Sequence, residues 1–137
     1  MKSYDENRIN EFLANYRNVA VVGISDKPER DSYQVAMYLK NHGYNVIPIN
    51  PKFDRWEGLQ AYPDLRSVPE SVKVEVVDVF RKPEAVVEVV NEAISLNPKL
   101  IWMQEDVVNE EAADLAKSKG ISVVMDRCMM KEHRKIE

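Results

Sequence analysis

The stretch that decides the fold is Asn18-Val-Ala-Val-Val-Gly-Ile-Ser25, in which four consecutive apolar residues are followed by a glycine. Valine is typical of strands, and an uninterrupted apolar run indicates a strand that is buried on both faces. A glycine directly after such a strand permits the tight turn and close backbone approach that nucleotide-binding α/β proteins use. We therefore predict a buried strand over residues 18–23 and a ligand-binding loop after it.

The rest of the chain alternates between further apolar runs and amphipathic or capped segments. The runs predict strands at residues 45–49, 74–80, 100–103 and 121–125. The segments predict helices over 9–16, 32–42, 83–94 and 110–119, and a short helix after Arg127, with loop and short pieces in 52–72. This alternation predicts an α/β fold with a single doubly wound, mostly parallel five-stranded sheet and helices on both faces. We expect residues 1–137 to form a single domain, with the N-terminal helix in residues 1–17 packing on the sheet.

Length and charge exclude several classes of function. The chain has 137 residues, 19 Lys and Arg against 23 Asp and Glu, and a formal charge of −4, which disfavours a nucleic-acid-binding protein. No apolar run is long enough to span a membrane, and the first residues lack the apolar core of a signal peptide. The single cysteine, Cys128, is expected to be packed in the core and fits a reducing compartment. We expect a cytoplasmic protein.

Positive charge gathers where the predicted strands end, although the chain as a whole is acidic. Lys27 and Arg30 follow the first strand, Lys52 the second, and Arg81 with Lys82 the third. Carboxyl ends of parallel strands meet at one edge, and basic groups there attract an anionic ligand. The alternative is that lysine and arginine simply favour loops.

The loop residues narrow the choice of ligand. Gly-x-Gly-x-x-Gly is absent, so beside Gly23 the anion contacts would come from backbone N–H groups, Ser25, Arg30 and the helix start at Ser32. The second strand ends in Asn50-Pro51-Lys52 without the carboxylate that binds the ribose of NAD, and lysine suits a phosphorylated ribose, as in NADP or coenzyme A. Neither a nucleophile elbow nor a P-loop is present, and His133 in the charged tail is expected to be solvated.

Several motifs together resemble the small stand-alone CoA-binding proteins, which share the Rossmann-type domain of the succinyl-CoA synthetase α subunit and of ADP-forming acyl-CoA synthetases. They run from about residue 18 to 134 and comprise Val-Ala-Val-Val-Gly23-Ile-Ser25, Lys27-Pro-Glu-Arg30-Asp-Ser32, Tyr38-Leu39, Gly43-Tyr44, Pro48-Ile-Asn50-Pro51, Gly58, Tyr62-Pro63, Val77-Asp-Val-Phe80, Trp102-Met-Gln104, Glu111-Ala-Ala113, Arg127-Cys128 and Glu132-His133.

The resemblance implies binding of coenzyme A or a short acyl-CoA, without catalysis, since the synthetases carry their catalytic parts in other domains. Pyrophosphate would lie at Gly23, Ile24, Ser25 and Arg30, the phosphorylated ribose at Asn50, Pro51 and Lys52, adenine beside Phe80 and Arg81, and pantetheine nearer Gln104. In one departure, Asp106 stands where many relatives have glycine.

Two other functions remain open from the sequence. One is an NADP-dependent oxidoreductase, against which stand the single-glycine loop and the lack of an obvious hydride-transfer residue. The other is a regulatory module that docks on a larger enzyme. A homodimer or a larger enzyme is thus left open as a partner beside the small CoA ligand, whereas nucleic acid and membrane are not expected.

Overall fold

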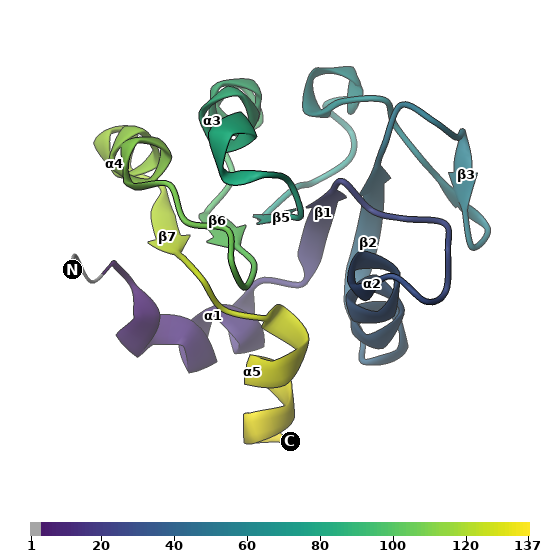
Figure 1. Cartoon of the computed structure of the whole chain (residues 1–137), viewed down its shortest axis with the longest axis horizontal. Coiled ribbons are helices and arrows are strands. Elements are labelled where there is room, and N and C mark those ends of the chain that lie inside the picture. Colours follow the sequence, from purple (N-terminus) through teal and green to yellow (C-terminus); the bar gives the residue numbers. More distant parts are fainter. Residues whose placement is uncertain (1–3) are drawn as a thin grey trace.

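The computed structural model describes residues 4–137, which form a parallel sheet between two layers of helices (Figure 1). The sheet has five strands in the order β2-β1-β5-β6-β7, and every neighbouring pair is parallel. Its strands are β1 (Asn18–Val22), β2 (Asn45–Ile49), β5 (Val76–Val79), β6 (Leu100–Met103) and β7 (Ser122–Val124). The predicted fold class is confirmed.

The helices alternate with the strands along the chain. They are α1 (Ile9–Asn15), α2 (Asp31–Asn41), α3 (Val86–Ile94), α4 (Glu110–Ser118) and α5 (Met129–Ile136). Short 3-10 turns precede α1 (Glu6–Arg8) and α3 (Pro83–Ala85). The segment between β2 and β5 holds a small antiparallel pair, β3 (Arg55–Trp56) and β4 (Leu59–Gln60), and a 3-10 turn (Leu65–Ser67). Among residues 4–137, no helix is long and apolar enough to cross a bilayer.

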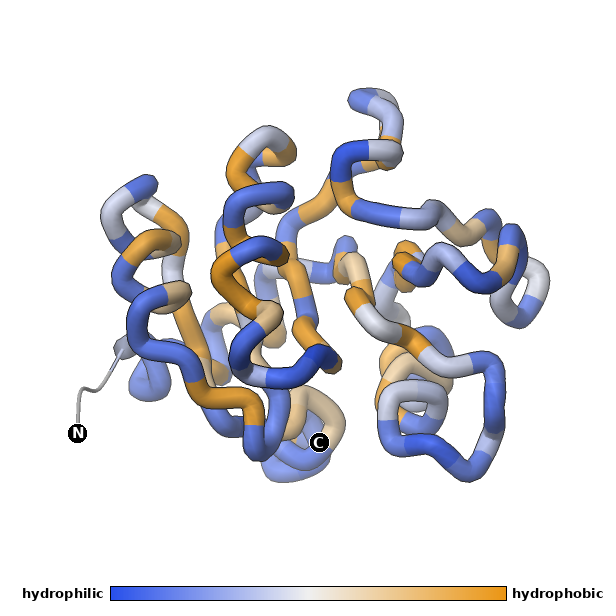
Figure 2. The backbone as a smooth tube through the Cα atoms, turned by 45° about the horizontal axis from the view of Figure 1, so that its top comes forward, coloured by the Kyte–Doolittle hydropathy of each residue, from blue (hydrophilic) through white to orange (hydrophobic). Residues whose placement is uncertain are grey.

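The helical layers cover opposite faces of the sheet. Helices α3 and α4 pack together on one face, whereas α1 and α2 both contact α5 on the other, as Figure 1 shows above and below the strands. Successive residues of β1 face the two layers in turn: Ala20 and Val22 join the α3–α4 core, and Val19 and Val21 join the other. Figure 2 shows hydrophobic residues along the strands and hydrophilic ones along the loop after β1.

The expectation for His133 was wrong. Its side chain is 8% exposed and shares a hydrogen bond of 2.8 Å with the Tyr38 hydroxyl through Nδ1. His133 lies on the inner side of α5, between Tyr38 and Tyr44, and burial lowers the pKa of its imidazole. The charged residues next to His133 in the sequence suggested exposure, but adjacent residues of a helix point in different directions, and His133 lies on the inner face of α5.

The order in which strands are added to the sheet reverses at β1, since β2 lies on one side of it and β5 on the other. In open α/β sheets this switch point opens a crevice at the carboxyl ends of the strands. Here the ends of β1 and β5 come very close. Gly23 has a φ of 85°, and a Cβ added there would lie 2.1 Å from the Phe80 carbonyl oxygen. Only glycine therefore fits at the start of the loop.

A single carboxylic acid lies in the middle of the sheet. Asp78 on β5 is fully buried between Val21 of β1 and Trp102 of β6, and among the described residues neither carboxyl oxygen has a hydrogen-bond partner. Burial raises the pKa of this carboxyl well above its ordinary value, because an ionised group would lose its hydration. Burial therefore favours the neutral, protonated form of Asp78 in the folded chain.

We expect Gly23→Ala to unfold more easily than Gly58→Ala. Both glycines have a positive φ, which costs a side chain about 1–2 kcal/mol, but around Gly58 nothing lies within 4 Å of an added Cβ. The clash with the Phe80 carbonyl should bring the loss for Gly23→Ala to about 3 kcal/mol or more. Chemical denaturation measures both, and equal losses would show that the β1–β5 approach is not tight.

Asp78→Asn should change how stability depends on pH. The folded chain keeps the Asp78 proton at pH values where the unfolded chain has lost it, so this group's stabilising contribution is complete below pH ~4 and declines as pH rises, by at most ~1.4 kcal/mol per pH unit. The variant lacks this decline. Urea unfolding at pH 5 and pH 8 measures the free energy of unfolding of both proteins. Relative to the unaltered protein, Asp78→Asn should be more stable at pH 8 than it is at pH 5. A pH-independent difference would mean that Asp78 is ionised in the fold.

Candidate functional site

Two adjoining clefts open at the carboxyl edge of the sheet. The inner cleft, of about 530 Å³, lies between the loop after β1, the ends of β5 and β6, and the start of α5. The outer cleft, of about 590 Å³, lies between the same loop and the end of β2. Gly23, Ser25 and Arg30 line both clefts, so the loop after β1 forms their common wall.

Hydrogen bonds within the molecule fix the shape of this loop. The Ser25 N–H donates to the Ser32 hydroxyl at 3.0 Å, and the Ser25 hydroxyl accepts from the Lys27 N–H at 3.0 Å. From the β3–β4 pair, the Trp56 indole N–H donates to the Ser25 carbonyl at 2.8 Å. In these bonds the Ser25 and Ser32 hydroxyls act as acceptors, so each keeps an O–H that can donate to an anion beside the exposed basic side chains.

Asn50 joins the ends of β1 and β2. Its side-chain amide donates to the Ile24 carbonyl at 2.8 Å, while its side-chain oxygen accepts from the Lys52 N–H at 2.8 Å. Ile24 itself is fully buried and its side chain belongs to the core, although the residue borders the outer cleft. Asn50 therefore positions the loop that carries Lys52 rather than standing free in the cleft.

Five basic side chains of this edge have no carboxylate partner in the described part of the chain, unlike Lys131, which pairs with Glu105 at 2.9 Å. Within residues 4–137, no ion pair involves the exposed residues Lys27, Arg30, Lys52, Arg81 or Lys82. At the opposite edge the charge is compensated: Glu75 accepts three hydrogen bonds from Arg17 and Asn18 and pairs with Lys73 at 3.5 Å. Although Asp26 and Glu29 lie in the same loop and Asp31 begins α2, the unpaired cations leave this edge able to attract a multiply charged anion.

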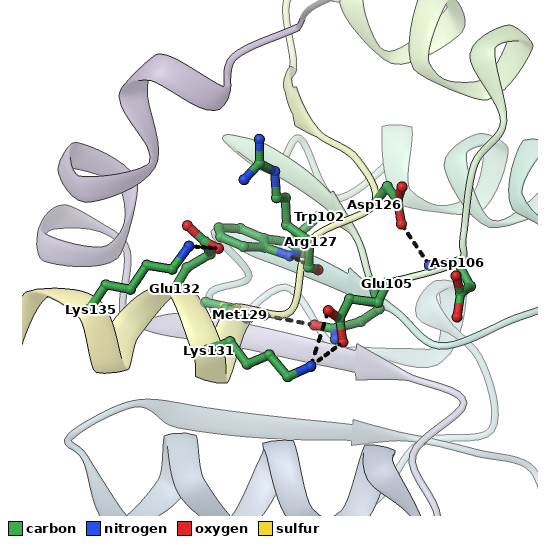
Figure 3. Close-up of polar contacts among 10 residues, drawn as sticks. Trp102, Glu105, Asp106, Asp126, Arg127, Met129, Lys131, Glu132 and Lys135 are labelled. Atoms are coloured by element: carbon green, nitrogen blue, oxygen red, sulfur yellow. Dashed lines mark hydrogen bonds and ion pairs between the residues drawn. The ribbon is translucent and has the colours of Figure 1, made fainter.

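The far side of the inner cleft is built from the ends of β6 and β7 (Figure 3). The Gln104 side chain is 4% exposed, and its oxygen accepts from the Met129 N–H at 3.1 Å, which fixes the start of α5. The Asp106 N–H donates to the Asp126 carboxylate at 2.8 Å. The φ of Asp106 is 68°, a left-handed value that aspartate tolerates better than most residues.

The structure brings the predicted site residues together with one exception. The inner cleft is lined by Gly23, Ser25, Arg30, Ser32, Phe80, Arg81 and Gln104, and the outer cleft adds Ile24, Lys27, Asn50 and Lys52. Pro51 instead lines a separate hollow of about 150 Å³ beside α3. Whether any of these residues contacts a ligand stays a prediction.

Other residues of the site had no clear signal in the sequence. Trp56 supports the loop from a segment that was predicted only as loop and short pieces. Cys128, Met130 and Lys131 reach the inner cleft from the start of α5, after the last strand. Cys128 is 5% exposed, which confirms that it is packed.

Comparison with known proteins identifies the family. Residues 17–134 match the model of the family described as the CoA binding domain. The chain is 35% identical over 133 residues to the uncharacterized protein YneT of Bacillus subtilis, covering 97% of both chains. A solved structure, a hypothetical protein from Pyrococcus horikoshii, superimposes with a TM-score of 0.90 at 40% identity, covering 98% of each chain.

A more distant relative is much longer. The α subunit of the ADP-forming acetate–CoA ligase II of Pyrococcus furiosus is 30% identical over 73 residues, which are 53% of this chain but only 16% of that protein. The similarity to the ligase is thus confined to a small part of it. Together with the family match over nearly the whole length, these findings show that the chain belongs to the CoA-binding domain family.

Proposed function

We propose that this protein binds coenzyme A, or a short acyl-CoA, in the two clefts at the carboxyl edge and catalyses no reaction on its own. The observation that carries the proposal is the row of unpaired basic side chains along those clefts in a chain of this family. Coenzyme A carries a pyrophosphate and a 3′-phosphate, so its charges are spaced along the molecule. Unpaired cations at both clefts suit such an extended anion better than they suit a single phosphate.

The positions of the cations suggest how the ligand lies. Arg30 stands between the clefts and can make two parallel hydrogen bonds to a phosphate, which suits the pyrophosphate. Lys52 borders only the outer cleft, as expected for the 3′-phosphate of the ribose. The uncharged pantetheine arm would then enter the inner cleft towards Gln104 and Met130. We further place the protein in the cytoplasm, where its single packed thiol would stay reduced.

Calorimetric titration of the protein with CoA and with NADP tests the function. We expect CoA to bind and to raise the thermal midpoint, by an amount equivalent to ~2.7 kcal/mol at 100 times its Kd. Binding of NADP without binding of CoA would instead support the oxidoreductase. Absence of CoA binding at about 1 mM would reject the proposal.

Arg30→Ala should weaken CoA binding by about 10- to 100-fold, because it removes a charged hydrogen bond worth about 1.5–3 kcal/mol. Arg30 is exposed and its side chain has no ion pair in the described part of the chain, so the variant should fold normally. Lys99→Ala, an exposed change at the opposite edge, is the control and should leave the Kd unchanged. Equal affinities for all three proteins would remove Arg30 from the site.

Lys52→Ala should abolish discrimination between CoA and dephospho-CoA, which lacks the 3′-phosphate. In the unaltered protein we expect CoA to bind more tightly than dephospho-CoA, since Lys52 would meet the extra phosphate. In Lys52→Ala the two Kd values should converge, whereas Lys99→Ala should keep the original ratio. A ratio near one in the unaltered protein would show that Lys52 does not contact the 3′-phosphate.

A further inference from the structure

A further hollow lies next to the inner cleft and is separate from the two clefts proposed to hold coenzyme A. This side chamber has a volume of about 640 Å³ and is bounded by the loop after β6, the loop after β7 and the outer side of α5. Its lining includes Val108, Met125, Arg127 and Lys135. It therefore offers room for a chemical group beyond the end of a ligand in the inner cleft.

The side chamber and the inner cleft share one wall. Glu105, Cys128 and Lys131 line both. The Lys131 ammonium bridges both oxygens of Glu105 at 2.9 and 3.1 Å, and Figure 3 shows this pair between the end of β6 and α5. Because both side chains are about half exposed, the pair contributes little to stability and can be displaced by a ligand at low cost. A pantetheine arm in the inner cleft would thus bring its sulfur to the mouth of the chamber.

The chemistry of the side chamber favours an uncharged chain. Val108 is 45% exposed, and together with Met125 it presents apolar surface to the chamber. Five carboxylates line the chamber against three basic side chains, and two of the basic side chains are already paired, Lys131 with Glu105 and Lys135 with Glu132. The excess of carboxylates in the chamber would repel an acyl group that ends in a carboxylate.

We propose that the side chamber is the acyl site of this protein and that it selects CoA thioesters with an uncharged aliphatic acyl group. The thioester lies at the shared wall formed by Glu105, Cys128 and Lys131, and the chain extends over Val108 and Met125. This inference rests on the proposed CoA binding, because it places the thiol end of CoA at that wall.

Titration with a series of thioesters tests the acyl site. Complete burial of one methylene tightens binding about fourfold, so in an open chamber we expect about twofold for each methylene from acetyl-CoA through butyryl-CoA to hexanoyl-CoA. Succinyl-CoA, with as many acyl carbons as butyryl-CoA but a terminal carboxylate, should bind more weakly than butyryl-CoA. If CoA binds while the whole series shows one Kd, the acyl site is rejected and CoA binding stands. If CoA itself fails to bind, both proposals fall.

Two variants locate the effect in the chamber. Val108→Asp should flatten the chain-length series without changing the Kd of CoA, because Val108 lies outside both clefts. Ile136→Asp is the matched control. The exposed fraction of Ile136, 43%, is similar to the 45% of Val108, but Ile136 does not line the chamber. The control should retain the twofold steps. A series that stays steep in Val108→Asp, or flattens equally in both variants, would contradict the proposed site.

Discussion

The close approach of β1 to β5 at Gly23 is the constraint on which the site depends. The loop after β1 leaves the sheet directly against the Phe80 carbonyl, which leaves no space for a side chain. The Gly23 N–H donates to the Ile49 carbonyl at 3.1 Å, and the Phe80 N–H donates to the Val22 carbonyl at 2.9 Å, so three strand ends are held together at this point. These bonds hold the start of the loop in place, and both clefts lie beside it, since Gly23 lines each of them.

Around that junction the protein uses its polar groups in two different ways. Ser25, Ser32, Asn50 and Trp56 bond to one another or to loop backbone and thereby hold the shape of the loop. The exposed basic side chains remain available for a ligand. A loop with several glycines can wrap a phosphate with its own N–H groups. Here a single glycine serves the turn, and in our proposal side chains such as Arg30 recognise the anion.

Local patterns in the sequence were sufficient for most of the fold. Strands β2 and β6 lie at the predicted residues. A run of apolar residues can be recognised from the local sequence alone, without knowing which strand pairs with it. Helix α4 begins at residue 110, as predicted, and the Asn109 side chain caps it by accepting from the Ala112 N–H at 2.9 Å. The short pair β3–β4 could not be bounded, since two-residue strands carry no periodic signal.

What the sequence did not indicate are contacts between distant segments. The Trp56 indole bonds a loop 31 residues away, and the Tyr38–His133 hydrogen bond joins helices 95 residues apart. Asp78 lies in the predicted strand 74–80, but nothing in the sequence shows that its carboxyl is fully buried without a hydrogen-bond partner among the described residues. Such contacts follow from the strand order and from how the helices pack, and neither can be predicted from a local sequence pattern.

We propose that CoA binds at the carboxyl edge of the sheet, around Gly23. Backbone amide NMR spectra recorded during a titration with CoA test it most directly. We predict that the signals that shift belong to residues 23–32, 50–53, 80–82 and 104–107 and to the start of α5. Signals at the opposite edge, around Gly43, Glu75 and Lys99, should stay unchanged. Shifts confined to that opposite edge would contradict the claim.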